Sequence, residues 1–268
     1  MFLIKDIHKF YCSTKLRQSS YPGDTKILMR DNIFGKKKGT LEDFAFNDEV
    51  AAVFDDMVER SIPNYGEIHR IVADIVRRYI PNNATVYDLG CSTGTTLVLM
   101  HQTAKSVDKN LKLIGIDASS SMLEKCKAKL DGQNVNAELL ESDLLEVKYQ
   151  DCDMIVMDYT LQFIPIEQRT ILLSKLYKAL KPGGRFVLAE KIASSSPKVQ
   201  EVITDLYYDF KRRHGYSELE IAQKREALEN VMKPLTPKDQ FSMLEEAGFN
   251  DVDMIFRWYN FAAWLAIK

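Results

Sequence analysis

The residues best suited to chemistry form a glycine-punctuated loop and a carboxylate that follows it at a distance. The run Val86-Tyr87-Asp88-Leu89-Gly90-Cys91-Ser92-Thr93-Gly94-Thr95 passes from an apolar strand pattern through the loop into a helical pattern. Glycines let the backbone come close to a ligand, and the free N–H groups of the following helix face an acceptor there. A second apolar segment ends in Asp117, at the spacing where α/β nucleotide-binding domains hold a ribose. Together these features predict an adenosine-containing ligand.

The glycine spacing argues against a dinucleotide. The pattern G-x-G-x-x-G is not met, because Ser92 stands two residues after Gly90 and the next glycine is Gly94. Asp88, just before the loop, repels a pyrophosphate and attracts a sulfonium or an ammonium group. The loop therefore favours a cationic ligand.

Two segments resemble the class I S-adenosylmethionine (SAM) dependent methyltransferases. The loop resembles their motif I, with Ser92 where many members have glycine. The segment 180–184, Leu-Lys-Pro-Gly-Gly, resembles the turn before their fifth strand. The resemblance implies a Rossmann-like α/β fold, with a mostly parallel seven-stranded sheet and helices on both faces.

Hydrophobic periodicity predicts the elements that position these residues. Two leading helices are expected at 47–59 and 67–79, separated at Pro63 and Asn64. Strands and helices then alternate, which implies parallel strands joined by right-handed crossovers. Strands are expected at 85–89, 111–117, 137–141, 154–158 and 185–191, with helices from 95 and at 119–130 and 167–180. A helix at 238–247 and an antiparallel C-terminal edge hairpin, 252–257 with 261–267, complete the expected single domain, 44–268.

A helical insertion is expected at about 197–233, after the fifth strand. Gly215 suits a left-handed helix cap, and Ser217 with Glu220 forms a capping box for a second helix. The cationic run 211–214 is interpreted as charge at a helix C-terminus, with anion binding as the alternative.

Further segments resemble the carboxy-S-adenosyl-L-methionine (carboxy-SAM) synthase family over about 220 residues from Phe46 onward. The helical insertion, which ordinary methyltransferases lack, carries most of the specificity. The matching segments are 46–50, 60–65, 87–92, 160–163, 209–212, 215–221, 223–225 and 228–232. The resemblance implies a homodimeric enzyme that carboxylates the SAM methyl group with prephenate, releasing phenylpyruvate. Carboxy-SAM then serves a separate enzyme that modifies the wobble uridine of certain tRNAs.

The resemblance also implies the ligand contacts. They fall on Tyr65, Gly90, Cys91, Ser92, Asp117, Ala118, Asp143, Leu144, Asp158 and Arg225. Asp117 is expected to accept hydrogen bonds from the ribose hydroxyls, and Asp143 with the Leu144 N–H to meet the adenine. Tyr65 is expected to cover the site, and Cys91 to contact the ligand through its backbone rather than act as a nucleophile.

Arg225 is the expected catalytic residue, and Asp158 departs from the family pattern. A guanidinium beside the SAM methyl group has a purpose only if a carboxylate is built there, because that region is already cationic. The family commonly has asparagine at position 158, so Asp158 either stabilises the sulfonium or repels prephenate. Without the resemblance, an ion pair that ties the insertion to the body also explains Arg225.

Two other functions remain open: a conventional SAM-dependent small-molecule methyltransferase, and a SAM-binding scaffold without chemistry. The segment 158–161 lacks the Asn/Asp-Pro-Pro-aromatic motif, which disfavours methylation of bases and amines but leaves oxygen acceptors.

Composition limits the partners and the location. The chain has 268 residues, 46% of them hydrophobic and 28% charged, and no apolar run of the roughly 20 residues that span a bilayer. Its four cysteines lack metal-binding spacing, so no metal is expected. The net charge is −2, but residues 1–40 hold nine Lys/Arg against three Asp, which leaves an acidic body poorly suited to nucleic acid. A flexible basic extension, 1–43, and a cytoplasmic protein without membrane contact are therefore expected.

Overall fold

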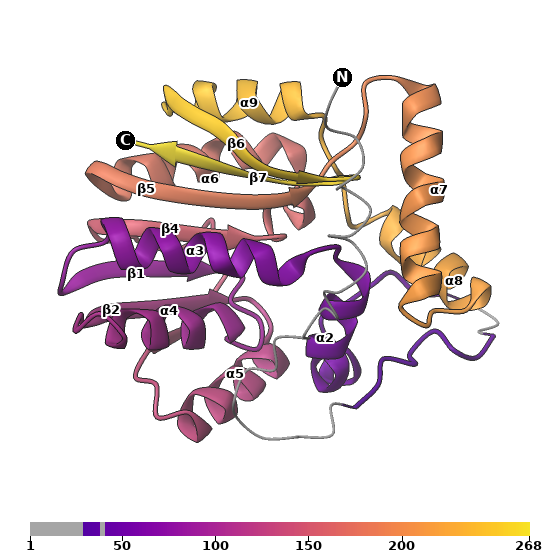
Figure 1. The fold of residues 1–268 in the computed structure, drawn as a ribbon, viewed down its shortest axis with the longest axis horizontal. Coiled ribbons are helices and arrows are strands. Elements are labelled where there is room, and N and C mark those ends of the chain that lie inside the picture. The colour runs from indigo at the N-terminus through magenta and orange to yellow at the C-terminus, as the bar shows by residue number, and fades with distance from the viewer. Residues whose placement is uncertain (1–28, 38–40) are drawn as a thin grey trace, which may run out of the picture.

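A computed structural model describes residues 29–37 and 41–268, and its centre is a seven-stranded sheet (Figure 1). The strand order is β3-β2-β1-β4-β5-β7-β6. The strands are β1 Ala84–Leu89, β2 Leu111–Asp117, β3 Glu138–Glu141, β4 Cys152–Asp158, β5 Leu180–Lys191, β6 Asp251–Trp258 and β7 Phe261–Ile267. The first five pair in parallel, and β7 runs antiparallel to both β5 and β6. The predicted mostly parallel sheet with an antiparallel edge hairpin is confirmed.

Helices cover both faces of the sheet. They are α2 Asp48–Ser61, α3 Tyr65–Tyr79, α4 Thr95–Lys105, α5 Ser120–Gly132, α6 Ile166–Ala179, α7 Pro197–Arg213, α8 Glu218–Glu229 and α9 Pro237–Glu246. One core cluster joins α3, α4 and α5 to the sheet, and another joins α6 and α9 to its other face. Within the described ranges, no helix combines the length and the apolar character needed to cross a bilayer.

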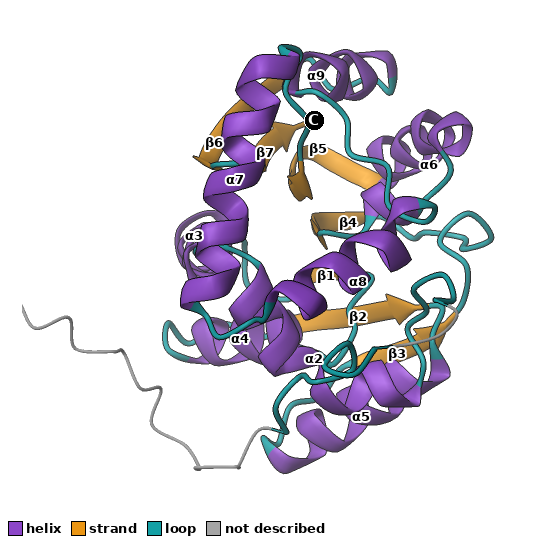
Figure 2. Ribbon diagram, turned by 90° about the vertical axis from the view of Figure 1, so that its right-hand side faces the viewer, coloured by secondary structure: helices purple, strands orange, loops and turns teal. Residues whose placement is uncertain are grey.

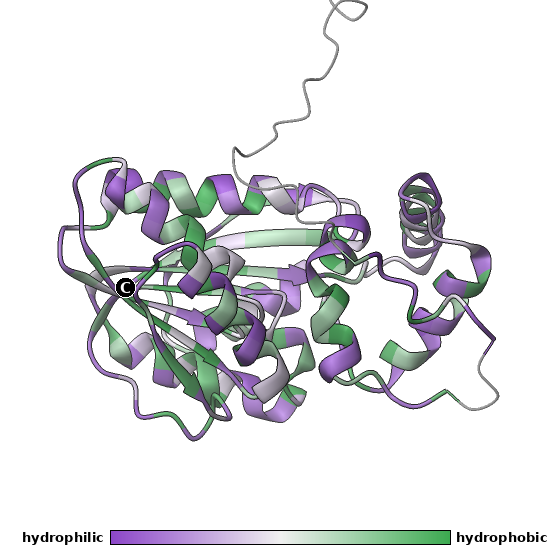
Figure 3. Ribbon diagram, turned by 90° about the horizontal axis from the view of Figure 1, so that it is seen from below, coloured by the Kyte–Doolittle hydropathy of each residue, from purple (hydrophilic) through white to green (hydrophobic). Residues whose placement is uncertain are grey.

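The strand β4 shows why the sequence builds this layered core. Met154 and Val156 belong to the cluster with α3, α4 and α5, whereas Ile155 and Met157 belong to the cluster with α6 and α9. Successive side chains of a strand point to opposite faces, so an unbroken apolar run fits a sheet that is covered on both. The strands are mainly green or pale in the hydropathy view, and the peripheral loops mainly purple (Figure 3).

The strand β5 differs from its predicted start. It begins at Leu180 instead of residue 185, and its pairing with β4 shifts register between Cys152 and Met154. Gly183 has a positive φ of 77°, so the predicted Pro-Gly-Gly turn lies inside an irregular strand.

The insertion forms the two predicted helices, α7 and α8, beyond the ends of the strands (Figures 1 and 2). Gly215 has a φ of 83° after the end of α7. The Ser217 side chain accepts from the Glu220 N–H, and the Glu220 carboxylate accepts from the Ser217 N–H at 2.7 Å. The local capping signals therefore set where α7 ends and α8 begins.

Residues 29–37 belong to the expected basic extension, but they pack against the body. Asp31 and Phe34 are buried. The Tyr216 hydroxyl donates to Asp31 at 2.6 Å, and the Gln223 amide donates to the Phe34 carbonyl at 2.8 Å. This short segment therefore differs from the flexible extension that was expected; residues 1–28 and 38–40 lie outside the described part of the chain.

Candidate functional site

A cavity of about 940 Å³ lies beyond the carboxyl ends of β1, β2 and β4. The strand β1 lies between β2 and β4, so the strand order reverses at this point of the sheet. Open α/β sheets bind ligands at such topological switch points. The lining includes every predicted site residue: Tyr65, Gly90, Cys91, Ser92, Asp117, Ala118, Asp143, Leu144, Asp158 and Arg225. The fold thus brings all of them to one cavity, while their contacts with a ligand stay predictions.

The loop after β1 is organised around Asp117. The Ser92 N–H donates to one Asp117 carboxylate oxygen at 2.9 Å, and the Ser119 N–H donates to the other at 2.9 Å. Burial raises the pKa of Asp117, and these backbone donors oppose the rise. Each carboxylate oxygen has capacity for a further hydrogen bond, so the side chain can still accept from hydroxyl groups of a ligand.

Gly90 is required by packing as well as by backbone geometry. Its φ is 72°, and a Cβ built on it would lie 2.2 Å from the Thr160 hydroxyl oxygen. Close approach of a ligand was the reason expected for a glycine at this position. The structure adds a direct contact between the loop and the segment after β4.

A partly buried lysine, Lys129, ties the loop to the helices around it. The Lys129 ammonium on α5 lies 2.8 Å from the Asp55 carboxylate on α2 and donates to the Thr93 and Thr95 hydroxyls at 2.9 and 2.8 Å. The Thr93 hydroxyl also donates to Asp55 at 2.6 Å. This network fixes α2, which forms one wall of the cavity, against the loop.

Two buried carboxylates give the cavity an anionic region. Asp88 on β1 has one carboxylate oxygen without a hydrogen-bond partner, and both oxygens of Asp158 lack one, among the described residues. Burial raises the pKa of Asp158 to about 7, and burial together with the charge of Asp158 raises the pKa of Asp88 well above its usual range. Unpaired acceptors of this kind fit a cationic ligand group such as a sulfonium or an ammonium.

Asp143 and Leu144 follow β3 at the edge of the cavity. Asp143 is exposed, and one of its carboxylate oxygens accepts from the Leu145 N–H at 2.8 Å. Leu144 is buried beside it. The pair therefore offers a carboxylate acceptor next to an apolar surface, which suits the edge of a purine ring.

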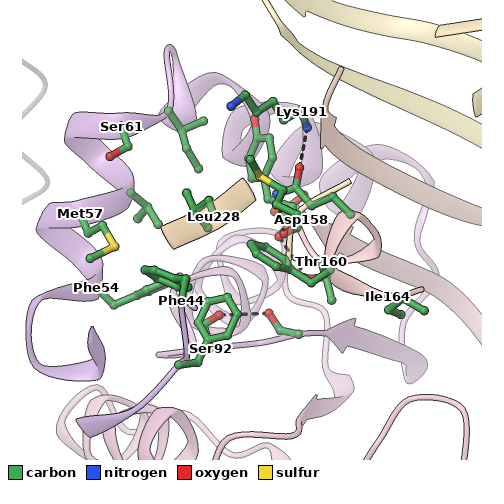
Figure 4. A pocket seen from close by; sticks show the side chains of 18 of the residues that line it. Phe44, Phe54, Met57, Ser61, Ser92, Asp158, Thr160, Ile164, Lys191 and Leu228 are labelled. Carbon is green, nitrogen blue, oxygen red and sulfur yellow. Dashed lines mark hydrogen bonds between the residues drawn. The ribbon is translucent and has the colours of Figure 1, made fainter. Parts of the chain in front are cut away.

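An aromatic wall closes the cavity on the side of α2 and α3. Tyr65 is the first residue of α3, and its ring centroid lies 4.4 Å from that of His69. Burial lowers the pKa of His69 to about 4, so its imidazole is neutral at pH 7. Phe44, Phe54 and Met57 lie across from Asp158 in the close view (Figure 4). These side chains give this side of the cavity a largely apolar surface.

The cations of the insertion form a second charged region. Arg225 on α8 lines the cavity with an exposed side chain, and in the described part of the chain it has no hydrogen-bond or ion-pair partner. The alternative that Arg225 ties the insertion to the body by an ion pair is therefore wrong among these residues. Three lysines, Lys191, Lys211 and Lys224, also line the cavity.

None of these lysines was predicted to line the cavity. The predicted place of Lys211 in the last turn of a helix is confirmed, but Lys211 is also only 5% exposed and lines the cavity, which its position in the sequence did not indicate. Arg212, the next residue, pairs with Asp209 and Glu218 on the surface instead. The available signal was the spacing of Tyr207 and Lys211, since residues four apart share a helix face and Tyr207 is a large, largely apolar side chain.

Comparisons with known proteins agree with the observed fold. Residues 86–184 match a family model described as a methyltransferase domain. A solved SAM-dependent methyltransferase, SibL in its apo form, superposes with a TM-score of 0.59 at 19% identity, covering 86% of this chain and 63% of that one. An O-methyltransferase family protein from Burkholderia thailandensis gives a TM-score of 0.59 at 15% identity, covering 83% and 60%. At these identities the likeness shows the fold.

Sequence relatives identify the family. A carboxy-S-adenosyl-L-methionine synthase from Nautilia profundicola is 42% identical over 240 residues, covering 90% of this chain and 100% of that one. One from Methylococcus capsulatus is 42% identical over 244 residues, with the same coverage. The chain thus matches each of these relatives over its full length. The chain therefore belongs to the carboxy-S-adenosyl-L-methionine synthase family, within the class I SAM-dependent methyltransferase superfamily.

Proposed function

We propose that this protein is an enzyme that converts SAM and prephenate into carboxy-SAM and phenylpyruvate. The observation that carries the proposal is the presence of two regions of opposite charge in one cavity. Carboxylates at the ends of β1 and β4 and a guanidinium on α8 each lack a partner among residues 29–37 and 41–268. A methyltransferase needs only the first, because the SAM methyl group is already cationic. An enzyme that builds a carboxylate onto that methyl group needs both.

SAM is expected to bind along the strand ends. Asp117 accepts hydrogen bonds from the ribose, Asp143 and Leu144 meet the adenine, and the loop of Gly90, Cys91 and Ser92 lies along the methionine end. The positions of these residues around the cavity support this placement. Asp158 then faces the sulfonium, where its negative charge is stabilising.

The proposed reaction has three steps. Prephenate becomes aromatic by losing carbon dioxide and hydroxide, which leaves phenylpyruvate. The hydroxide takes a proton from the sulfonium methyl group, forming water and an ylide. The ylide carbon then adds to carbon dioxide and forms the new carboxylate. Carbon dioxide must stay in place between steps, and the aromatic wall of Tyr65, Phe44 and Phe54 supports a cavity that retains it.

Arg225 is proposed to bind the new carboxylate. Its guanidinium can form a bidentate, charge-assisted pair with it, worth on the order of 1.5–3 kcal/mol. The same fork is able to meet a prephenate carboxylate earlier in the reaction. Its lack of a protein partner among the described residues supports this role.

Mass analysis after incubation with SAM and prephenate tests the proposal. The expected product is carboxy-SAM, formed in equal amount with phenylpyruvate. S-adenosylhomocysteine in its place would identify a conventional methyltransferase, and unchanged SAM would identify a binding scaffold. Omitting prephenate is the control, and carboxy-SAM is then expected to be absent.

We also propose that the protein is a homodimer that uses α7 in its interface. Val199, Val202 and Leu206 are exposed apolar residues on this helix, at 49%, 57% and 41%. Their spacing of three and four residues places them on one face. Charged substitutions at Val202 and Leu206 are expected to convert a dimer to a monomer in analytical ultracentrifugation, and an unchanged mass would contradict the proposal.

The proposed product is consumed elsewhere. We infer that carboxy-SAM passes to a separate enzyme that modifies the wobble uridine of tRNA. We also infer that this chain does not itself bind nucleic acid, since its net charge is −2 and residues 1–40, with nine Lys/Arg against three Asp, leave the rest of the chain acidic. Because cells make SAM in the cytoplasm, we place the reaction there.

A further inference from the structure

Three lysines lie together beside Arg225 at the cavity. Lys191 ends β5, Lys211 is on α7, and Lys224 is on α8. Lys211 and Lys224 are each only 5% exposed. Lys224 lies 3.5 Å from Asp31 and donates to the Ser61 hydroxyl at 3.0 Å. The ammonium groups of Lys191 and Lys211 have neither a hydrogen-bond nor an ion-pair partner among the described residues.

Two tyrosine rings hold these lysines next to one another. The Lys191 and Lys211 ammonium nitrogens lie 5.2 and 5.1 Å from the centroid of the Tyr207 ring. The Lys211 and Lys224 nitrogens lie 5.8 and 5.3 Å from that of Tyr216. The Tyr207 hydroxyl donates to the Ser61 carbonyl at 3.0 Å, which fixes that ring in place. The cluster therefore joins β5, α7 and α8 through contacts with the same two tyrosine rings.

The cluster is unfavourable without an anion. Burial and the neighbouring lysines lower the pKa of Lys211 well below its usual range, and burial with the charge of Lys224 lowers the pKa of Lys191 to about 8. Burying like charges together opposes folding. The carboxylates of Asp31 and Asp56 offset only part of the charge, because Arg60 adds a further cation near Lys224. An anionic ligand in the adjoining cavity relieves this repulsion.

We propose that Lys191, Lys211 and Lys224 bind the carboxylate of the donor that remains in the released product, and not the carboxylate that is transferred. This inference rests on the proposed function. The donor is then a dianion whose two carboxylates occupy different subsites. The lysine cluster binds the retained carboxylate, and the carboxylate that leaves lies in a region free of these lysines.

The chemistry of decarboxylation favours this assignment. When carbon dioxide leaves, negative charge moves off the departing carboxylate, so a lysine paired with that group stabilises the reactant more than the transition state. A retained carboxylate keeps its charge throughout, and pairing with it holds the donor without slowing the reaction. Arg225 directly follows Lys224 in α8, so the retained and the newly formed carboxylate can be bound by neighbouring residues.

The variant Lys211→Met tests the proposal, with Lys198→Met, an exposed position on the same helix, as its control. Prephenate and its product phenylpyruvate share the retained carboxylate. Lys211→Met is therefore expected to raise the KM for prephenate and the inhibition constant of phenylpyruvate by the same factor, about tenfold or more. The Kd for SAM is expected to stay within about twofold of the wild-type value. Lys198→Met is expected to change none of these quantities.

Two results would overturn the assignment. A higher KM for prephenate with an unchanged inhibition constant for phenylpyruvate would mean that the cluster binds the departing carboxylate. No change in either quantity would mean that the cluster binds neither carboxylate. If Lys211→Met does not fold by circular dichroism, Lys191→Met at the end of strand β5 makes the same test.

Calorimetry separates this proposal from the proposed function. Phenylpyruvate binding to wild-type and Lys211→Met protein, each saturated with SAM, needs no turnover. A weaker complex in the variant supports the subsite even if mass analysis finds no carboxy-SAM. Equal binding overturns it even if carboxy-SAM is made.

Discussion

Asp88 and Asp158 stand on neighbouring parallel strands, β1 and β4, and both line one cavity with carboxylate oxygens that lack a hydrogen-bond partner in the described chain. The charge of Asp158, added to burial, raises the pKa of Asp88. Two buried carboxylates on neighbouring strands destabilise the folded protein when they are ionised, and a bound cation offsets this effect.

Replacing Asp158 with asparagine is expected to stabilise the ligand-free protein at pH 8. Burial raises the folded-state pKa of Asp158 to about 7, above the usual unfolded value near 4. Above pH 7 the carboxylate is charged in both states and buried in one, so it destabilises the fold. Below about pH 4 it is neutral in both states, and the penalty is gone. Urea unfolding at pH 8 and pH 4 measures the difference.

The expected gain at pH 8 is on the order of a few kcal/mol, fading toward zero at pH 4. Asp205→Asn, at an exposed position on α7, is the control and is expected to have little effect at either pH. A gain for Asp158→Asn that is equal at the two pH values would contradict the role of its charge.

The preference for SAM over S-adenosylhomocysteine is expected to rise with pH in the wild type. The two ligands differ in the positive sulfonium, and Asp158 attracts it only when ionised. Because the Asp158 pKa is about 7, the ratio of the two Kd values is expected to grow between pH 6 and pH 8. In Asp158→Asn the ratio is expected to change less. Isothermal titration calorimetry with both ligands checks this, and identical pH profiles for the two proteins would contradict it.

Arg225→Leu is expected to weaken carboxy-SAM binding while sparing S-adenosylhomocysteine. Losing a charge-assisted pair of 1.5–3 kcal/mol corresponds to roughly a tenfold to hundredfold rise in Kd. S-adenosylhomocysteine has no carboxylate at the sulfur, so its Kd is expected to stay within about twofold. Competition binding on one protein preparation measures both. Equal loss of the two ligands would mean that Arg225 shapes the cavity without contacting the carboxylate.

Gly90→Ala is expected to destabilise the loop after β1. The added Cβ would lie 2.2 Å from the Thr160 hydroxyl oxygen, and the φ of 72° disfavours any residue with a Cβ. Gly66→Ala on α3 is the matched control, because nothing lies within 4 Å of its Cβ position and alanine favours a helix. Thermal melting is expected to show a lower Tm for Gly90→Ala and an equal or higher Tm for Gly66→Ala. A Gly90→Ala protein as stable as the wild type would contradict the packing argument.

Local sequence patterns predicted most of the fold, because hydrophobic periodicity and helix caps depend on residues that are close together in the sequence. Alternating apolar strands and helices gave the parallel sheet, and the capping signals at Gly215 and Ser217 gave the helices of the insertion. The family resemblance placed ten site residues that the structure brings to one cavity. These predictions depend on short-range periodicity or on matched motifs, both of which can be read along the chain.

The lysine cluster and the packing of residues 29–37 depend on contacts between distant segments. Asp31 meets Tyr216 and Lys224 across more than 180 positions of the chain, and no periodic pattern encodes such a contact. Lys211 lies in the last turn of α7, as expected for a helix-terminal charge, and contacts with residues distant in the sequence, such as Lys191 and Asp31, accompany its burial. Tertiary contacts of this kind are the part that the sequence alone did not predict.

The most direct test of the central claim follows one carbon atom. Prephenate labelled with ¹³C in the carboxylate attached to its ring is incubated with SAM in unlabelled bicarbonate, and the product is analysed by mass spectrometry. A carboxyl group that passes from donor to SAM inside one closed cavity predicts carboxy-SAM that retains the label in full. Carboxy-SAM without the label, or S-adenosylhomocysteine as the only product, would contradict it.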